Sequence, residues 1–188
     1  MVKILALPAK IFKLIPVMSI IKHHAQRVAV LLDVQNMYHS AKNLYNARVN
    51  FKAVLEAAVA NRDLVRAIGY VIRTESGEEK SFLEALVKIG IETKLKDLQI
   101  FAGGMKKADW DVGMAVDAIR LAQNASINAI VLVTGDGDFI PLVEYLKSHG
   151  IQAEVMAFAR STSQKLQEAA DDFTDLGAEP KKYLMRIK

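Results

Sequence analysis

Apolar runs and amphipathic stretches alternate along this chain, which indicates a fold in which strands and helices alternate. Residues 28–32 and 129–133 are apolar throughout, as strands buried on both faces of a parallel sheet are. Elsewhere apolar positions recur at helical spacing, most clearly in residues 109–124. The strands that this pattern predicts are residues 27–34, 64–73, 91–101, 129–134 and 151–158. The predicted helices are residues 36–45, a helix capped by Asn50, and residues 82–90, 109–124, 139–148 and 163–170.

The connections between these strands have the length of ordinary right-handed crossovers. We therefore expect an α/β fold, a three-layer α/β/α sandwich around a mostly parallel central sheet of about five strands. The domain is expected to span residues 27–176, between an N-terminal extension of residues 1–26 and a basic C-terminal tail of residues 177–188. Two interpretations of the extension stay open. It is an amphipathic segment that docks on the domain or on a membrane surface, or it lies upstream of a true start at Met18.

Length and composition limit the number of domains and the kinds of metal site and partner that the chain can have. The 188 residues suffice for one well-buried domain. The chain has no cysteine, which excludes disulfides, zinc-thiolate sites, iron–sulfur clusters and thiol catalysis, so that any metal must have oxygen or histidine ligands. The 25 basic residues against 21 acidic ones give a net charge of +4, which mildly favours an anionic partner.

The extension contains an aliphatic run at residues 11–21. This run is too short for a membrane span of about 20 residues, and Lys13 and Pro16 interrupt it. Lys10 and Lys13 also stand where a signal peptide needs an uninterrupted apolar core. We therefore expect no stable membrane insertion and a cytoplasmic location.

Two acidic turns follow the two most apolar strands. Asp33 and Asn36 come after the first of these strands, and Thr134, Asp136 and Asp138 come after the second. Because the carboxyl ends of parallel strands meet at one edge of the sheet, where ligands of open α/β sheets bind, we expect these side chains to converge. Their mutual repulsion is unfavourable unless a cation offsets it, so a divalent metal is the simplest explanation.

Asp111, in the first turn of the long helix, can reach the same edge. Together with Asp33, Asp136 and Asp138 it would offer hard oxygen ligands, which select Mg²⁺ or Mn²⁺. An ion held in this way polarises a phosphodiester oxygen and makes water acidic enough to attack. The sequence thus predicts a metal centre suited to phosphodiester hydrolysis.

Three further polar residues are expected to support this centre. Asn36 lies one helical turn beyond Asp33, where its amide can orient the substrate or a water without adding charge. Thr134 is suited to fix a neighbouring carboxylate or to hold a ligand water. Asp117 lies off the helix face of the metal ligands, and it either stands behind them or forms an ion pair with Arg120.

Each acid also has an ordinary structural explanation. Asp136 follows a glycine and could be a turn residue and helix cap, and Asp138 could stabilise a helix N-terminus through the helix dipole. Asp33 alone could be a strand-end turn. Their joint position at one sheet edge favours the metal site over these separate explanations. The four histidines, with no metal-ligand spacing, are interpreted as structural or surface residues: His23, His24, His39 and His149.

At these residues the chain resembles the NYN-domain family of PIN-like nucleases, specifically its LabA-like branch. The resemblance covers residues 27–158 or somewhat beyond, and it rests on three ordered motifs at residues 33–36, 111–117 and 134–139. It implies a PIN-like α/β/α sandwich whose acidic residues bind Mg²⁺ or Mn²⁺ and cleave RNA by hydrolysis. The positions that match the family pattern are Asp33, Asp111, Asp136 and Asp138 for the acids, Asn36 for the polar position, and Asp117 for the later acid of the helix motif.

The first functional hypothesis is a metal-dependent endoribonuclease that acts on single-stranded or loop RNA. Its expected RNA contacts are Lys94, Lys96, Lys106 and Lys107 along the backbone, with Trp110 or Tyr38 stacking on a base. A solvated face is the alternative for the lysines, and packing at the helix start is the alternative for Trp110. Two other functions stay open: a weakly active or inactive RNA-binding regulatory module of the same fold, and a metal-dependent phosphoesterase that acts on small substrates.

Overall fold

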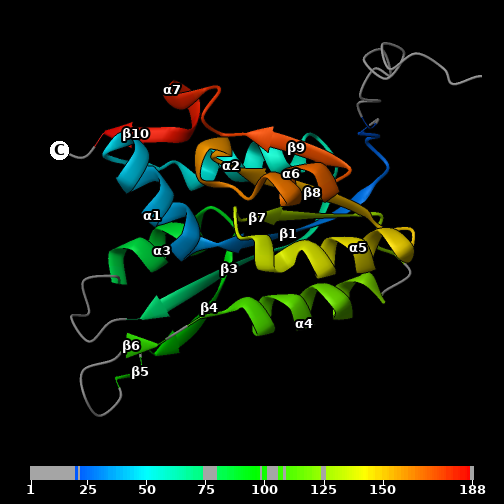
Figure 1. Ribbon diagram of the computed structural model, residues 1–188, viewed down its shortest axis with the longest axis horizontal. Coiled ribbons are helices and arrows are strands. Elements are labelled where there is room, and N and C mark those ends of the chain that lie inside the picture. Colours follow the sequence, from blue (N-terminus) through cyan, green and yellow to red (C-terminus); the bar gives the residue numbers. More distant parts are fainter. Residues whose placement is uncertain are drawn as a thin grey trace, which may run out of the picture.

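A six-stranded parallel sheet forms the centre of the molecule, with helices on both faces (Figure 1). The computed structural model describes residues 20, 22–73, 80–97, 99–100, 106–107, 109–123 and 126–186. In spatial order the strands of the sheet are β4 (Glu92–Asp97), β3 (Asp63–Arg73), β1 (Arg27–Asp33), β7 (Ala129–Val133), β8 (Gln152–Ala157) and β9 (Asp172–Asp175). Every neighbouring pair is parallel. The predicted α/β/α sandwich is confirmed, with one strand more than expected.

The helices divide between the two faces of the sheet because successive residues of a strand point to opposite sides. Val28, Val30 and Leu32 of β1 pack in one apolar core, and Ala29 and Leu31 pack in the other. The first core is covered by α1 (Val34–Tyr45), α2 (Phe51–Val59), α3 (Lys80–Lys88) and α7 (Pro180–Tyr183). The second is covered by α4 (Asp111–Ala122), α5 (Ile140–Ser148) and α6 (Gln164–Ala169).

The strand order reverses beside β1. From β1 the chain builds β3 and β4 on one side, and it then returns to place β7, β8 and β9 on the other side. At such a reversal the connections leave in opposite directions, which opens a crevice at the carboxyl ends of the two central strands. The turns after β1 and β7 lie at this crevice, and they carry the acidic residues predicted from the sequence.

Several boundaries differ from the predictions. The first helix begins at Val34 rather than near Asn36, because Asp33 caps it. The strand expected at residues 91–101 ends at Asp97 in the structure, and β5 (Gln99–Ile100) pairs with β6 (Lys106–Lys107) in a separate two-stranded sheet. The turn after β7 contains the short 3₁₀ helix η2 (Gly137–Phe139) before α5 begins, and η3 (Ala159–Ser161) follows β8.

The end of the chain folds onto α1 and α2. Strand β10 (Leu184–Arg186) pairs antiparallel with β2 (Ala47–Val49), and the ring of Tyr183 is buried. The backbone N–H of Asn50 donates to the carbonyl oxygen of Tyr183 at 2.8 Å. The region expected as a basic tail, residues 177–188, is therefore part of the folded structure as far as Arg186.

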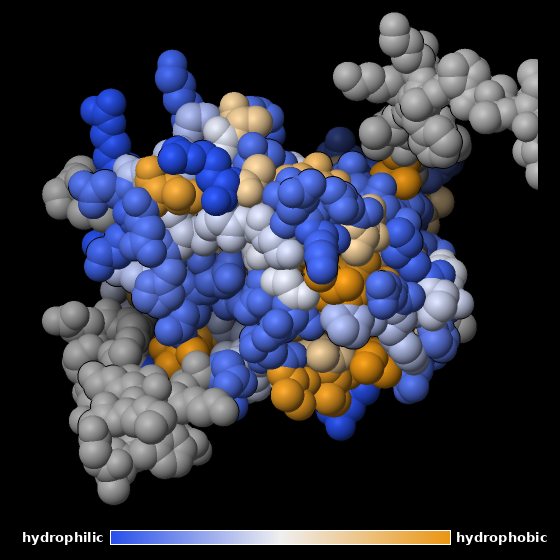
Figure 2. Space-filling view, in the orientation of Figure 1, coloured by the Kyte–Doolittle hydropathy of each residue, from blue (hydrophilic) through white to orange (hydrophobic). Residues whose placement is uncertain are grey.

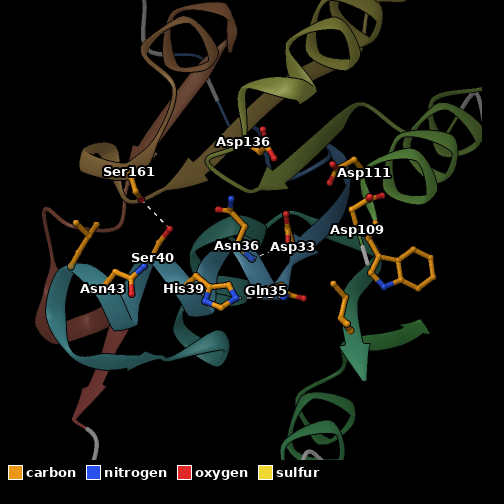
Figure 3. A pocket seen from close by; sticks show the side chains of 13 residues that line it. Asp33, Gln35, Asn36, His39, Ser40, Asn43, Asp109, Asp111, Asp136 and Ser161 are labelled. Atoms are coloured by element: carbon orange, nitrogen blue, oxygen red, sulfur yellow. Dashed lines mark hydrogen bonds between the residues drawn. The ribbon is translucent and has the colours of Figure 1, made fainter. Parts of the chain in front are cut away.

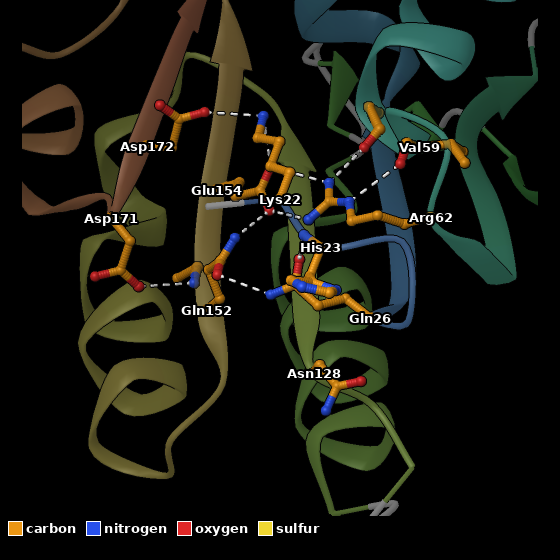
Figure 4. Close-up of polar contacts among 12 residues, drawn as sticks. Lys22, His23, Gln26, Val59, Arg62, Asn128, Gln152, Glu154, Asp171 and Asp172 are labelled. Atoms are coloured by element: carbon orange, nitrogen blue, oxygen red, sulfur yellow. Dashed lines mark hydrogen bonds and ion pairs between the residues drawn. The ribbon is translucent and has the colours of Figure 1, made fainter. Parts of the chain in front are cut away.

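A network of charged side chains lies at the amino end of the sheet, opposite the acidic turns (Figure 4). Arg62 and Glu154 are both buried and form a bidentate ion pair, in which the second contact, Nη2 to Oε2, measures 3.1 Å. Lys22 joins the network through Glu154 at 3.0 Å and Asp172 at 2.9 Å. The last residues before β1, assigned above to an extension, therefore contact the domain; residues 1–19 and 21 lie outside the described part.

In Figure 2 the surface around α1 is mostly hydrophilic with one small apolar patch, whereas more apolar side chains gather over α4. On α4 the exposed apolar residues are Val112 and Val116. Within the described ranges, no helix combines the length and the hydropathy that a membrane crossing requires.

Candidate metal centre

Three carboxylates meet at the crevice between β1 and β7. Asp111 begins α4, and Asp136 and Asp138 lie in the turn between β7 and α5. One oxygen atom from each of the three lies within 4.8 Å of the other two, which is close enough for a single ion to contact all of them. Figure 3 shows Asp111 and Asp136 pointing toward each other and toward Asp33. Distant segments of the chain therefore form one acidic site, which contains three of the four carboxylates expected as metal ligands.

The chemistry of these donors fits a hard divalent cation. All three are carboxylate oxygens, and among the described residues no lysine or arginine forms an ion pair with them or with Asp33. Burial raises the pKa of the Asp111 carboxyl, and the negative charges of Asp136, Asp109 and Asp138 raise it further, whereas Lys96 lowers it. A bound divalent cation would remove this repulsion.

Asp33 lies beside the cluster and is not one of its three close members. Its Oδ1 accepts the backbone N–H of Asn36 at 2.9 Å, which makes it the N-cap of α1, and its Oδ2 accepts the hydroxyl of Thr134 at 3.4 Å. Burial raises the pKa of the Asp33 carboxyl from its ordinary value of 3.8 to about 6. The charges of Asp111 and Asp136 act in the same direction, and the two hydrogen bonds act against it.

The capping role considered for Asp136 is also present. Its Oδ1 accepts the backbone N–H of Asp138 at 3.0 Å and caps η2, and its own N–H donates to the hydroxyl oxygen of Thr134 at 3.3 Å. The buried Thr134 therefore connects Asp33 to Asp136. Capping and clustering are not alternatives here, because the caps fix the side chains in the positions at which they converge.

Asn36 connects the two turns. Its side-chain oxygen accepts the backbone N–H of Gly135 at 3.0 Å, so the amide group must direct its NH₂ elsewhere. Gly135 is confined in turn, because a Cβ atom there would lie 2.8 Å from the hydroxyl oxygen of Thr162. The orientation of Asn36 therefore leaves two N–H donors at the opening beside the acids (Figure 3).

Asp117 lies in a different cluster. Its Oδ2 accepts the hydroxyl of Tyr70 at 2.8 Å and the ammonium of Lys94 at 2.6 Å, and Arg120 is 4.0 Å from Oδ1. Of the two interpretations of Asp117, the contacts match the ion pair. Lys94 is consequently paired with a carboxylate, and the Tyr70 hydroxyl has its pKa raised by burial and by its hydrogen bond to Asp117.

Three other residues were predicted to contact RNA, and they differ in how far they are packed against the fold: Trp110, Lys96 and Tyr38. Trp110 donates its indole N–H to the carbonyl of Val71 at 3.0 Å, and a Cβ atom at Gly113 would come within 2.6 Å of its ring. Trp110 thus packs at the helix start, and Lys96 lies 5.8 Å from its ring centroid. Tyr38 is 44% exposed.

Lys106 and Lys107 form strand β6. Only their backbone is described, so their predicted RNA contacts lie outside the described side chains.

A cavity of about 360 Å³ extends from the acids along α1. Its lining includes His39, which was interpreted above as a structural or surface residue, together with Ser40 and Ser161. Local sequence gives no reason to select Ser161, because only the folded position of η3 after β8 brings it to the cavity. The recurrence of polar residues at helical spacing along α1 is the signal that could have identified His39.

We expect Asp33→Asn to make the metal-free protein more stable at neutral pH. A folded-state pKa of about 6 means that the folded protein binds a proton at Asp33 more tightly than the unfolded chain does. In the wild type, the stability that this proton contributes is present below pH 4 and is lost as the pH rises through 6. Asparagine keeps the capping oxygen without the charge. Urea unfolding with a chelator present should show the variant more stable by up to about 3 kcal/mol at pH 8, with little difference near pH 4.

Asp63→Asn is the matched control, because Asp63 is an exposed acid at the opposite end of the sheet, where it pairs with Arg27 at 3.7 Å. It should show no comparable pH-dependent gain. A variant Asp33→Asn that is no more stable than the wild type at pH 8 would contradict the role of buried charge at this site.

Comparison with known proteins finds the NYN domain, whose family model matches residues 27–177. An uncharacterised protein of Methanocaldococcus jannaschii is 32% identical over 153 residues, which are 81% of this chain and 56% of that protein. The chain thus spans little more than half of that relative. The low amplitude and bright protein LabA of Synechococcus elongatus is 27% identical over 159 residues, which are 80% of this chain and 83% of LabA.

The fold also occurs in a solved structure. The crystal structure of a protein of unknown function from Vibrio parahaemolyticus superimposes with a TM-score of 0.78 at 30% identity. The match covers 88% of this chain and all of the other.

Proposed function

The chain belongs to the NYN domain family, and from this premise we propose that it is a metal-dependent endoribonuclease that hydrolyses RNA phosphodiester bonds at the acidic cluster. The observation that carries the proposal is the meeting of Asp111, Asp136 and Asp138 within the distance that one divalent ion spans. Mg²⁺ or Mn²⁺ is the proposed cofactor, and RNA in the cytoplasm is the proposed substrate.

Asp111, Asp136 and Asp138 would hold the ion, and Asp33 would add a fourth negative charge beside it. When bound, such an ion would polarise a phosphoryl oxygen and lower the pKa of a water molecule beside it, which favours that water as the nucleophile. A cation bound there would also offset the repulsion between these negative charges.

The uncharged side chains of Asn36 and Thr134 would position the substrate and the acids. Because the side-chain oxygen of Asn36 accepts the Gly135 N–H, its NH₂ group is available to donate to a phosphate oxygen at the mouth of the site. Thr134 keeps Asp33 and Asp136 at a fixed separation through its single hydroxyl. These contacts hold the cluster in position before substrate binds. Pre-organised charges stabilise a transition state more effectively, because they need not reorganise during the reaction.

The proposal is tested by incubating the purified protein with end-labelled single-stranded RNA in Mn²⁺, in Mg²⁺ and in excess chelator. We expect internal cleavage with either metal, none with the chelator, and recovery when metal is restored. Gel separation of the products distinguishes internal cuts from trimming at the ends. Binding of the RNA without cleavage under all metal conditions would instead support an RNA-binding regulatory module.

A further inference from the structure

The cavity beside the metal centre has two chemically different ends. The acids line one end, and residues of α1 line the other (Figure 3). Gln35, His39 and Asn43 are spaced by four residues on that helix, so their side chains form a row along one face. The cavity volume of about 360 Å³ lies within the range of about 300–1,000 Å³ found for small-molecule pockets. A single nucleotide is of this scale, and a duplex is not.

The α1 end of the cavity is lined by polar side chains, and none of the described ones there is a carboxylate, lysine or arginine. Gln35 and Asn43 each offer a donor and an acceptor, and the ring of His39 offers a donor at Nδ1 because its Nε2 accepts from Gln35. Gln35 and His39 already contact each other, with 3.4 Å between Nε2 atoms. No lysine or arginine is among the described residues that line the cavity, so a second phosphate would find no cation there. The hydrogen-bonding groups match an uncharged partner, such as ribose hydroxyls or the edge of a base.

Apolar surfaces and a fixed wall complete the cavity. Leu44, Ile72 and Trp110 contribute apolar lining, and the indole of Trp110 is held by its hydrogen bond to a backbone carbonyl. At the α1 end the hydroxyl of Ser161 donates to the oxygen of Ser40 at 3.0 Å, which ties α1 to η3. The cavity thus combines flat apolar contact with polar groups, the two kinds of contact that a nucleobase requires.

We propose that Gln35, His39 and Asn43 bind the nucleoside of one unpaired RNA nucleotide adjacent to the phosphate held at the metal centre, a subsite that rests on the proposed nuclease function. The phosphate occupies the acidic end, where the ion offsets its charge, and the ribose and base extend along α1. A base within a duplex is stacked and paired, and its edge is not free to enter the cavity. The subsite therefore selects single-stranded or looped RNA.

The test compares the wild type with the double variant His39→Ala/Asn43→Ala in Mn²⁺ with a short unstructured RNA. Both side chains are exposed and alanine favours the helix, so the variant should fold. We expect KM to rise about 10- to 30-fold from the loss of two hydrogen bonds, with kcat changed far less. Mn²⁺ affinity, measured by calorimetry without RNA, should be unchanged.

An RNA in which one nucleotide lacks its base provides the second measurement. Placed beside the cleaved bond, the abasic nucleotide should reduce kcat/KM of the wild type about tenfold and that of the double variant much less, because both changes remove the same contacts. Gln123→Ala is the matched control. It truncates an exposed amide just beyond the C-terminal end of α4, about 18 Å along the helix from Asp111, and should behave as the wild type.

The outcomes separate the subsite from the nuclease. If the wild type cleaves and the double variant has an unchanged KM, the subsite is refuted and the nuclease stands. If the wild type does not cleave, the nuclease is refuted, and RNA binding in Ca²⁺ by fluorescence anisotropy decides the subsite. About tenfold weaker binding by the double variant would support it, and equal binding, or no binding by either protein, would overturn it.

Discussion

Asp136→Asn should leave the protein folded and lower its metal-dependent RNA cleavage at least about 10³-fold, because loss of a metal contact removes several kcal/mol of transition-state stabilisation. The asparagine oxygen can still accept the Asp138 N–H that Asp136 accepts at 3.0 Å, so the η2 cap survives. What is lost is one of three charges that a single ion would contact. Single-turnover cleavage in saturating RNA, with Mn²⁺ varied, measures the effect.

Asp63→Asn again serves as the control, since it removes an exposed carboxylate at the far end of the sheet and should retain the wild-type rate. Circular dichroism and thermal unfolding of both variants establish that they fold. If cleavage by Asp136→Asn equals that of the control, the activity does not arise at the acidic cluster. A rate that recovers only at high Mn²⁺ would show weakened capture of the ion.

The elements that the sequence predicts best are those whose pattern has a single physical explanation. Strands β1 and β7 are buried along nearly their whole length, which only an apolar run permits. Asn50 caps α2 by accepting the N–H of Ala53, as local capping chemistry requires. Since β1 and β7 are neighbours in the sheet, the turns that follow them must meet. The position of Asp33 beside Asp136 and Asp138 therefore follows from two local patterns and one rule of topology, whereas Asp111 reaches the site from the start of α4.

The missed elements depend on partners distant in the chain. Strand β9 is four residues long, partly buried and polar at both ends, so its pattern is no different from that of a loop until β8 pairs with it. Strands β2 and β10 are three residues each, and they stabilise one another across more than a hundred residues. No periodicity can develop over so few positions.

Side-chain partners were harder to predict than backbone elements. The hydrogen bond from Gly135 to Asn36 joins residues 99 positions apart, and it fixes which end of the amide faces the opening. Asp117 matched a family position, yet it lies beside Tyr70 and Lys94, because its place on α4 turns it toward β3 and β4. Predicted RNA-contacting lysines share this difficulty, since exposure depends on neighbours that the sequence does not identify.

Arg62→Met should destabilise the protein by about 3–5 kcal/mol, the second large effect that we expect. Arg62 is 5% exposed and Glu154 is 1% exposed, so the substitution leaves a buried carboxylate without its main partner. Lys22 and Gln152 still contact Glu154, at 3.0 and 2.8 Å, which places the effect toward the lower end of this range. Arg62 also donates to the carbonyls of Ala58 and Val59, two acceptors that methionine cannot satisfy. Urea unfolding of the variant and the wild type measures the difference.

The double variant Arg62→Met/Glu154→Leu should recover much of the lost stability, because replacing both members of a buried pair by apolar side chains removes the unpaired charge.

Arg66→Met is the control for loss of an arginine ion pair at the surface. Arg66 pairs with Glu92 where both are substantially exposed, and its loss should amount to about 1 kcal/mol or less. If Arg62→Met and Arg66→Met lowered the free energy of unfolding equally, burial of the ion pair would not increase its importance for stability. Since Arg62 lies at the amino end of the sheet, Mn²⁺-dependent cleavage by its folded variant should stay at the wild-type rate, which separates stability from catalysis.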